Sequence, residues 1–407
     1  MKVLLSAYAC EPNKGSEPGV GWHWAQEIEK LGHQVWVLTR KNNQEVIESY
    51  FQKKQKPRGL HFIYYDVPKW LVWWKKGGRG VYLYYLLWQI GAFFATKKNH
   101  KKYKFDQIQH CTFVSVRQPS FMGLLGIPFI FGPVGGGERA PYALRRGFGW
   151  KGWLKDFIRD VANHIVRFDP LMHMTFFSAD KIYVTSEQTK QTIPFFYQHK
   201  VKIKLAVGYD GELLDTAVVQ KKHVNGNTNS VLKVLYVGRF ECWKGMGLGI
   251  KAFSLLLQSE PKATLTMVGK GPDEARWRAL AGKLGVANNI IWIPWLDQYE
   301  LKALYLSHDI FLFPSLHDSG GMVVLEAMAH GLPVVCANLG GPKEMVDESC
   351  GVVATADNLV NDLEHALKML AENPHLRCEM TLGAIKRANV FSWTKVVKSI
   401  YKHGENQ

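Results

Sequence analysis

Two cations flank a short turn in the second half of the chain. Arg239 and Lys244 lie five positions apart and follow the predicted strand Lys233–Gly238. An arginine fork and a lysine point charge held on one turn can together neutralise a diphosphate. The pattern therefore predicts a phosphate-binding turn, and solvated surface charge is the alternative.

Two acids bracket a glycine pair further along the chain. Asp318 precedes Gly320 and Gly321, and Glu326 follows about two helical turns later. Glycines at the start of a helix let a phosphate approach free backbone N–H groups, to which the helix dipole adds. A carboxylate at Glu326 could then accept hydrogen bonds from sugar hydroxyls. An unrelated pair of acids is the alternative.

Three further glycine segments follow or precede predicted elements. Gly269 begins the turn Gly269-Lys-Gly-Pro after a strand, which a tight turn alone could explain. The segment 15–22, which contains Gly19, is predicted to precede a helix, and the segment 132–138 to follow a strand. Both place flexible backbone at a ligand-binding edge. A dinucleotide Gly-x-Gly-x-x-Gly loop and a Walker lysine motif are missing.

One histidine lies where catalytic groups collect. His110 ends the predicted strand Gln107–Cys111, at the carboxyl edge of a parallel sheet. It could orient a sugar hydroxyl or stabilise developing positive charge. A structural histidine with satisfied hydrogen bonds is the equal alternative.

The elements that must position these residues form an α/β pattern. Short β-branched and aromatic runs alternate with longer helical stretches, which is typical of parallel sheets covered by helices. The predicted strands are Val3–Tyr8, Gln34–Thr39, His61–Asp66, Gln107–Cys111, Phe129–Phe131, Lys181–Thr185, Lys233–Gly238, Thr264–Val268, Ile290–Pro294, Ile310–Phe313, Val334–Cys336 and Val352–Ala354.

Two open α/β domains are therefore expected, with residues 220–230 as a solvated loop. We predict an N-terminal domain over 1–208, a C-terminal domain over 209–390, and a helix in 391–407 that packs back on the first domain. Two facing sheets would share one cleft at their carboxyl edges.

Composition narrows the classes of partner. The chain has 407 residues, 47% of them hydrophobic, and Lys and Arg exceed Asp and Glu by 51 − 35 = 16. This excess favours an anionic partner: nucleic acid, a membrane surface or a phosphorylated small molecule. Six scattered cysteines predict neither a disulfide framework nor a metal site, and indicate a reducing, cytoplasmic compartment.

One segment raises the question of membrane contact. Residues 80–96 carry no charge and are flanked by lysines, and Trp70, Trp73 and Trp74 lie just upstream. A buried helix of a large domain is the favoured interpretation, and an interfacial helix is the alternative.

Together these motifs resemble the retaining family-4 glycosyltransferases of the GT-B fold (glycosyltransferase group 1). The resemblance covers nearly the whole chain, from the glycine-rich segment 15–22 and Leu31–Thr39 through the Val237-Gly-Arg turn and Gly269 to the acid pair and Gly331-Leu-Pro-Val-Val. The segment 132–138 resembles bacterial members that build cell-surface polysaccharides. In the family the first acid is normally glutamate, where this chain has Asp318.

The resemblance implies roles for the site residues. Arg239, Lys244 and the amides of Gly320 and Gly321 would bind the donor diphosphate, and Glu326 the donor ribose. Gly19 and Gly269 would also line the donor site, and His110 and Asp318 would act near the transferred sugar. The donor would be a UDP-, GDP- or ADP-linked sugar, with no further cofactor and no metal.

We therefore expect a retaining, metal-independent hexosyltransferase that acts on a lipid-linked or cell-surface glycan acceptor. It would be cytoplasmic, with a peripheral position on the inner face of the membrane and an anionic membrane surface as a candidate partner. A GT-B enzyme with a small-sugar acceptor, such as a disaccharide-forming synthase, is the first alternative. A basic nucleic-acid-binding protein is a remote one, since no nucleic-acid motif is present.

Overall fold

The computed structural model describes residues 1–75, 77, 80–113, 115–209, 211 and 231–401. The predicted loop 220–230 and the last six residues of the predicted C-terminal segment lie outside the described residues. Contacts divide the chain into two compact units: Met1–Gly137, Val161–Val207 and Trp393–Gln407 form the first, and Glu138–Asp160 and Gly208–Ser392 form the second.

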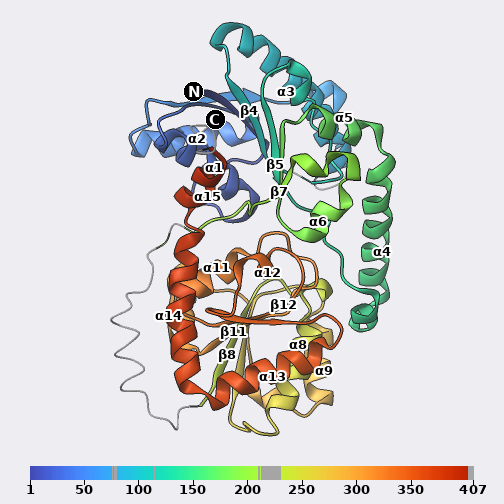
Figure 1. Cartoon of the computed structure of the whole chain (residues 1–407), viewed down its shortest axis with the longest axis vertical. Helices are drawn as coiled ribbons and strands as arrows, with labels where there is room; N and C mark the ends of the chain where they lie inside the picture. Colours follow the sequence, from blue (N-terminus) through green and yellow to red (C-terminus); the bar gives the residue numbers. More distant parts are fainter. Residues whose placement is uncertain (76, 78–79, 114, 210, 212–230, 402–407) are drawn as a thin grey trace. The chain divides into compact units, whose positions relative to one another are not determined.

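The first unit contains a sheet of seven parallel strands in the order β3-β2-β1-β4-β5-β6-β7 (Figure 1). Strands such as β1 and β4 are buried over almost their whole length, as expected of a parallel sheet covered on both faces. The strands are β1 Lys2–Ala7, β2 Gln34–Arg40, β3 Leu60–Tyr65, β4 Gln107–Thr112, β5 Phe129–Val134, β6 Lys181–Val184 and β7 Val201–Ile203.

Helices connect these strands, and α15 packs beside α1 although the two are far apart in the sequence. The α-helices are α1 Ser16–Lys30, α2 Gln44–Lys53, α3 Val81–Tyr103, α5 Pro170–Ser178, α6 Glu187–Thr192 and α15 Trp393–Tyr401. The 3-10 turns are η1 Lys41–Asn43, η2 Lys69–Leu71, η3 Met122–Leu125, η5 Val166–Phe168 and η6 Phe195–Lys200.

Two glycine segments of this unit differ from the sequence prediction. The helix α1 already begins at Ser16, so Gly19 and Gly21 lie inside it and not in a loop before it. A Cβ at Gly19 would lie 2.1 Å from the Lys14 carbonyl oxygen, and one at Gly21 would lie 2.2 Å from that of Ala9. Close backbone packing therefore requires these glycines. Likewise, β5 extends through Val134 and includes the first part of the segment 132–138.

The second unit contains six parallel strands in the order β10-β9-β8-β11-β12-β13. The chain runs from β8 outward through β9 to β10 and then returns to β11, on the other side of β8. Such a topological switch point is where open α/β sheets bind ligands. The strands are β8 Lys233–Val237, β9 Thr264–Val268, β10 Ile290–Ile293, β11 Ile310–Phe313, β12 Val334–Ala337 and β13 Gly351–Ala354.

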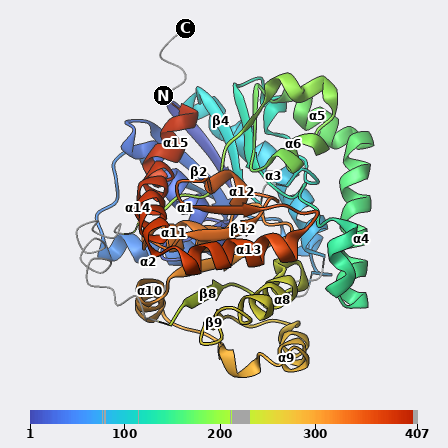
Figure 2. The ribbon, with the colours of Figure 1, turned by 60° about the horizontal axis from the view of Figure 1, so that its bottom comes forward.

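Helices cover both faces of this sheet (Figure 2). On one face α8 packs against α9 and α13, and on the other α11 packs against α12 and α14. The α-helices are α8 Met246–Leu256, α9 Glu274–Lys283, α10 Gln298–Ser307, α11 Met322–Ala329, α12 Pro342–Met345, α13 Leu359–Glu372 and α14 Pro374–Val390, with 3-10 turns η7 Cys242–Lys244 and η8 Ala287–Asn289.

A segment from the first half of the sequence completes the second unit. Residues 138–160 carry η4 Tyr142–Gly147 and most of α4 Trp150–Ile165, and their contacts place them in the second unit. The domain boundary near residue 208 drawn from the sequence assigns this segment to the N-terminal domain. The reason for the difference is a buried ionic contact with the second unit, described below.

The uncharged segment 80–96 forms most of α3. Its buried side chains include Tyr85, Trp88 and Gln89, whereas Tyr82 and Phe94 are exposed. Among the described residues, no helix has both the length and the hydropathy needed to cross a bilayer.

Candidate functional site

Three loops meet at the carboxyl edge of the second sheet, where the predicted cation turn and acid pair lie. The loop after β8 is joined to that after β9 by a hydrogen bond of 2.9 Å from the Phe240 amide to the Lys270 carbonyl. It is joined to the loop after β11 by another of 2.9 Å from the Leu316 amide to the Trp243 carbonyl. These backbone bonds fix the loops relative to one another.

Glycines allow these loops to approach so closely. Gly245 has φ of 72°, and a Cβ there would lie 2.0 Å from the Pro314 carbonyl oxygen at the end of β11. Gly269 has φ of 146°, and its Cβ would lie 1.9 Å from the carbonyl oxygen of Gly238. Side chains at either position would push the loops apart. Gly269 is therefore accounted for by packing at the same edge as the predicted donor site.

Lys244 and Asp318, predicted from separate motifs, form an ion pair through Nζ and Oδ2. Both side chains are mostly buried, at 12% and 15% exposed. The Lys244 ammonium also lies 4.4 Å from the centre of the Trp243 ring, close enough for a cation–π contact. The lysine is thus held in place by an aromatic face and a carboxylate.

Arg239 is placed differently from Lys244. Its side chain is 76% exposed, and its Nη2 lies 2.9 Å from Oε1 of Glu241. The two cations therefore follow the same strand, but only Lys244 is fixed by packing. Glu241, which the sequence analysis did not single out, is the partner that orients the Arg239 guanidinium.

Gly321 immediately precedes α11, as the glycine pair predicts. It takes the left-handed conformation, with φ of 76° and ψ of 43°, immediately before the first helical residue Met322. No side chain caps the helix at this position. The loop that contains Asp318 and Gly320 is held by Gly340 and Gly341, because the Gly341 amide donates to the Asp318 carbonyl at 2.7 Å.

Glu326 lies on α11 and is partly buried. Burial raises the pKa of its carboxyl group, although a hydrogen bond of 3.1 Å from the Tyr305 hydroxyl to Oε2 opposes this shift. Tyr305 stacks on His330, with ring centres 5.3 Å apart, and Nδ1 of His330 lies 2.7 Å from the Glu326 carbonyl oxygen. Tyr305, which belongs to no sequence motif, therefore orients Glu326, the residue predicted to bind the donor ribose.

A buried ionic cluster lies next to Asp318 and was missed by the sequence analysis. Nε2 of His317 lies 2.9 Å from Oδ1 of Asp156 on α4, and the His317 ring stacks on Trp243 with centres 4.7 Å apart. Arg145, which is 1% exposed, pairs with Asp156 at 3.4 Å and with Asp160 at 2.6 Å. The spacing of Arg145, Asp156 and Asp160 gives no sequence signal, because the contact with His317 spans 161 positions.

His110 and Gly19 belong to the first unit. His110 is fully buried in β4, with Nε2 lying 2.8 Å from the Tyr85 hydroxyl and 3.3 Å from the amide nitrogen of Gln89. Burial lowers the pKa of its imidazole to about 4, so the ring is neutral near pH 7. Its surroundings are those of a core histidine, and its catalytic role remains a prediction.

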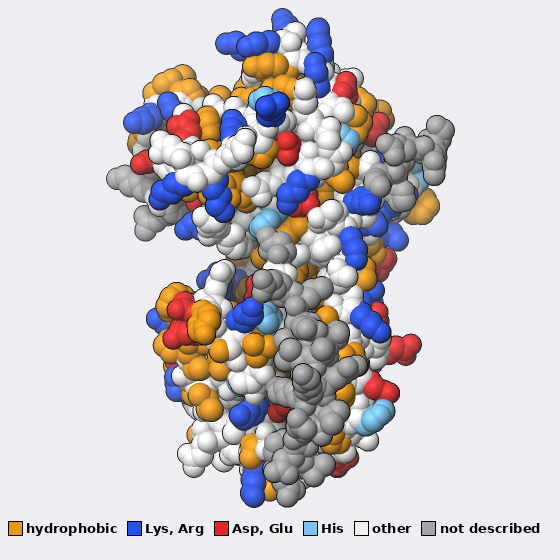
Figure 3. Space-filling model, turned by 90° about the vertical axis from the view of Figure 1, so that its left-hand side faces the viewer, with side chains coloured by type: hydrophobic (Ala, Val, Ile, Leu, Met, Phe, Trp, Pro, Cys, Tyr) orange, Lys and Arg blue, Asp and Glu red, His pale blue; other side chains and the backbone are white. Residues whose placement is uncertain are grey.

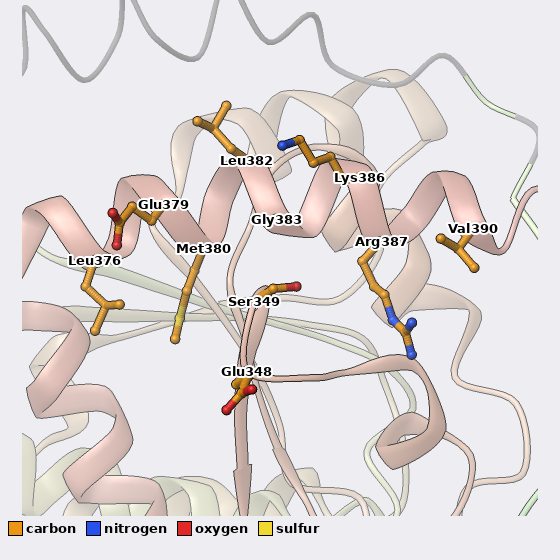
Figure 4. Close-up of a pocket in the computed structure, with 10 residues that line it drawn as sticks. All are labelled: Glu348, Ser349, Leu376, Glu379, Met380, Leu382, Gly383, Lys386, Arg387 and Val390. Carbon is orange, nitrogen blue, oxygen red and sulfur yellow. The ribbon is translucent and has the colours of Figure 1, made fainter.

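A separate hollow of about 560 Å³ lies beside α14 (Figure 4). Its lining includes Leu376, Met380 and Arg387 from the helix and Glu348 and Ser349 from the loop before β13. None of the predicted site residues lines it. This hollow therefore takes no part in the candidate site.

The part of the chain that forms this edge of the second sheet matches a known protein family. Residues 220–387, less than half of the chain, match the family described as Glycosyl transferases group 1. A D-inositol 3-phosphate glycosyltransferase of Acidothermus cellulolyticus is 31% identical over 177 residues, which cover 41% of this chain and 39% of that protein. A glycogen synthase of Mycobacterium tuberculosis is 32% identical over 182 residues, covering 43% and 44%. The matched part thus spans less than half of these two relatives.

Solved structures resemble the chain over its whole length. WaaG, a glycosyltransferase involved in lipopolysaccharide biosynthesis, has a TM-score of 0.58 at 18% identity and covers 100% of both chains. Anabaena HepE in complex with UDP has a TM-score of 0.62 at 13% identity, covering 99% of this chain and 98% of that one. The predicted fold class is confirmed: the chain has two Rossmann-like parallel-sheet domains, as in GT-B glycosyltransferases.

Proposed function

We propose that the protein is a retaining glycosyltransferase that moves a hexose from a nucleoside-diphosphate sugar to a lipid-linked or cell-surface glycan acceptor. The observation that carries the proposal is the meeting of Lys244, Asp318, the start of α11 and Glu326 at one edge of the second sheet. The family match over 220–387 contains all four.

The chemistry required is stabilisation of a leaving diphosphate. Lys244 is already fixed, and Arg239 can turn from Glu241 toward a phosphate at little cost because it is exposed. Backbone N–H groups at Gly320, Gly321 and the start of α11 add donors and the positive end of the helix dipole. Charges oriented before the reaction stabilise the transition state without further reorganisation.

Asp318 holds Lys244 until the donor arrives. When the donor diphosphate binds the Lys244 ammonium, the Asp318 carboxylate is free to accept a hydrogen bond from a hydroxyl of the donor sugar. In the retaining reaction proposed here, the acceptor oxygen attacks the anomeric carbon from the face that the diphosphate leaves, and the diphosphate takes the acceptor proton. No side chain is needed as a nucleophile, and no divalent metal is assigned a role.

The remaining predicted residues are assigned to the same reaction. Glu326 accepts hydrogen bonds from the donor ribose, and Gly269 keeps the loop after β9 close to the phosphates. Gly19 lets the start of α1 pack closely against the Lys14 carbonyl, and we assign it to the donor site. His110 acts near the transferred sugar, through the hydrogen bonds of its neutral ring.

The acceptor assignment draws on the solved lipopolysaccharide enzyme, the excess of cations and the exposed aromatic residues. We propose in addition that the enzyme acts in the cytoplasm, against the inner face of the membrane. The match with a D-inositol 3-phosphate glycosyltransferase favours a second candidate, a GT-B enzyme with a small acceptor such as a disaccharide-forming synthase. For the nucleic-acid alternative we find no support on the face in Figure 3, where lysines and arginines are dispersed and not gathered in one stripe.

Ligand-dependent melting and turnover test the proposal. UDP, GDP, ADP and their sugars are screened for a rise in melting temperature, since a ligand that binds only the folded protein stabilises it. Lys244→Ala and Arg239→Ala are compared with Lys262→Ala, a cation before β9 at the opposite edge of the sheet. We expect Lys244→Ala to lower kcat by about 100-fold and Lys262→Ala to leave it unchanged.

The result that would refute the proposal is normal turnover in both site variants, or no response to any nucleotide. Turnover that survives EDTA supports the metal-free mechanism, and loss that Mg²⁺ restores contradicts it. The product's anomeric configuration, read by NMR, separates retention from inversion.

A further inference from the structure

The helix α4 (green, at the right of Figure 1) exposes an apolar stripe along its whole length. The stripe consists of Trp150, Trp153, Leu154, Phe157, Ile158, Val161 and Ile165, all exposed. These positions follow the i, i+3, i+4, i+7 spacing of a single helical face. Trp150 is 73% exposed and Ile158 58%, so the face lies open to solvent.

The polar face of the same helix is the one that points inward. Asp156 and Asp160 are paired with the buried Arg145, and Asp156 also contacts His317. Arg159 donates to the Glu138 carbonyl oxygen at 3.1 Å. A surface helix of a soluble protein normally buries its apolar face and exposes its charges. In α4 this order is reversed, and buried ion pairs hold the helix in that orientation.

The charges that remain at the surface of the helix are cationic. Both of its carboxylates, Asp156 and Asp160, are turned inward, whereas Lys151 and Lys155 are exposed beside the stripe. Arg146, in the turn just before α4, is exposed as well. Tryptophan and phenylalanine between lysines suit the boundary of a bilayer, where rings enter the acyl region and ammonium groups reach the phosphates.

We propose that the exposed face of α4 is a docking surface for an anionic lipid bilayer. The proposal rests on the proposed function, since it supplies the surface through which the enzyme would meet a lipid-linked acceptor. It differs from the segment 70–96 that the sequence suggested, because α3 buries Tyr85 and Trp88 from the same run. It also ties the docking helix through Asp156 to the loop that carries Asp318.

Vesicle flotation of the full chain tests this surface. Vesicles of phosphatidylcholine alone are compared with vesicles that also contain phosphatidylglycerol, and we expect binding to the second kind that weakens with added salt. Trp150→Glu combined with Ile158→Glu should lower the bound fraction about tenfold or more. Both side chains point outward, so the fold and the response to nucleotides should be unchanged.

Two matched variants locate the contact. Phe195→Glu with Phe196→Glu alters the most exposed pair of η6, and Trp70→Glu with Trp73→Glu alters the rival segment. Both should bind vesicles like the wild type. Equal binding by the α4 variant, or loss only in the 70–73 variant, would overturn the proposal. So would a wild-type dimer that the α4 variant converts to a monomer, since the stripe would then be a contact between copies.

The readout is independent of turnover. A protein that binds vesicles through α4 but responds to no nucleotide would refute the proposed function and leave the docking surface standing. A protein that responds to a nucleotide but does not bind vesicles would refute the docking surface and leave the proposed function standing.

Discussion

At the scale of single residues, two of the ionisable groups predicted for the site are held away from water. Glu326 is held by Tyr305 at a partly buried position, and His110 lies in a fully buried one. Burial opposes the charged form of each group, so the pKa of the carboxyl is raised and that of the imidazole is lowered. Each group therefore makes folding depend on pH in a way that a single substitution can reveal.

Glu326→Gln should stabilise the free protein at pH 7 and weaken donor binding. Because the folded protein raises the pKa of this carboxyl, its ionisation costs stability as the pH rises above the unfolded value. The difference in melting temperature between the two proteins should shrink as the pH falls toward 4.5, the unperturbed pKa. The nucleotide-induced shift should be smaller in the variant. Glu379→Gln, at an exposed position on α14, is the control and should change neither quantity.

His110→Gln should flatten part of the acid limb of the stability curve. In the unfolded chain this histidine has the ordinary pKa of 6.5 and binds a proton below that pH. In the folded protein its pKa is about 4, so it stays neutral until the pH falls to about 4. Stability is therefore lost as the pH falls through that window, by about 3 kcal/mol in total. Urea unfolding of both proteins from pH 7 to 4 measures the difference. Parallel curves for the two proteins would show that His110 does not titrate in this way.

At the scale of elements, the site depends on loops that glycine lets approach one another. Gly245 ends η7 in the left-handed region and lies against the end of β11, and Gly340 lies against the Asp318 carbonyl. These contacts set the distance between the cation turn and the acid loop. A methyl group at such a position acts on the site without touching a ligand.

Gly245→Ala should destabilise the protein by roughly 1–3 kcal/mol and weaken nucleotide binding. The added Cβ would meet the Pro314 carbonyl oxygen, and φ of 72° disfavours alanine. Gly247→Ala, two residues later in α8, is a matched control because its Cβ would find only ordinary contacts at 3.7 Å. Urea unfolding compares the two, and equal stability would contradict the steric argument.

At the scale of the whole molecule, one ionic cluster determines to which unit a segment belongs. Residues 138–160 enter the second unit, where Asp156 joins Arg145 and His317. Charges at such burial are stable only when paired, so the cluster ties the segment to its unit. The apolar face of α4 is exposed for the same reason, since its polar face is occupied.

A double-mutant cycle on Asp156→Ala and His317→Ala should show a coupling of about 1 kcal/mol or more. Each single change leaves charged or polar partners unpaired in a buried place, and the second change then costs less. Asp156→Ala combined with His365→Ala, an exposed position on α13, should be additive. Additivity in both cycles would mean that the contact between Asp156 and His317 does not hold the segment.

The sequence alone determined the local part of this protein. All twelve predicted strands have bounds within three residues of an observed strand, because an apolar run bounded by turn residues is a local signal. The short β7 was missed, since Val201–Ile203 is too brief to give a pattern. The glycine turns at 245, 269 and 321 were found because their spacing to neighbouring strands is itself a sequence feature.

Only the tertiary structure decided which distant side chains meet. The ion pair of Lys244 with Asp318, the bond from Tyr305 to Glu326 and the contact of Asp156 with His317 join residues that are 74, 21 and 161 positions apart. The sequence likewise did not predict that His110 is buried or that the apolar face of α4 points outward. Periodicity reports which face of an element is apolar, whereas the partner of that face depends on packing free energy summed over the folded chain.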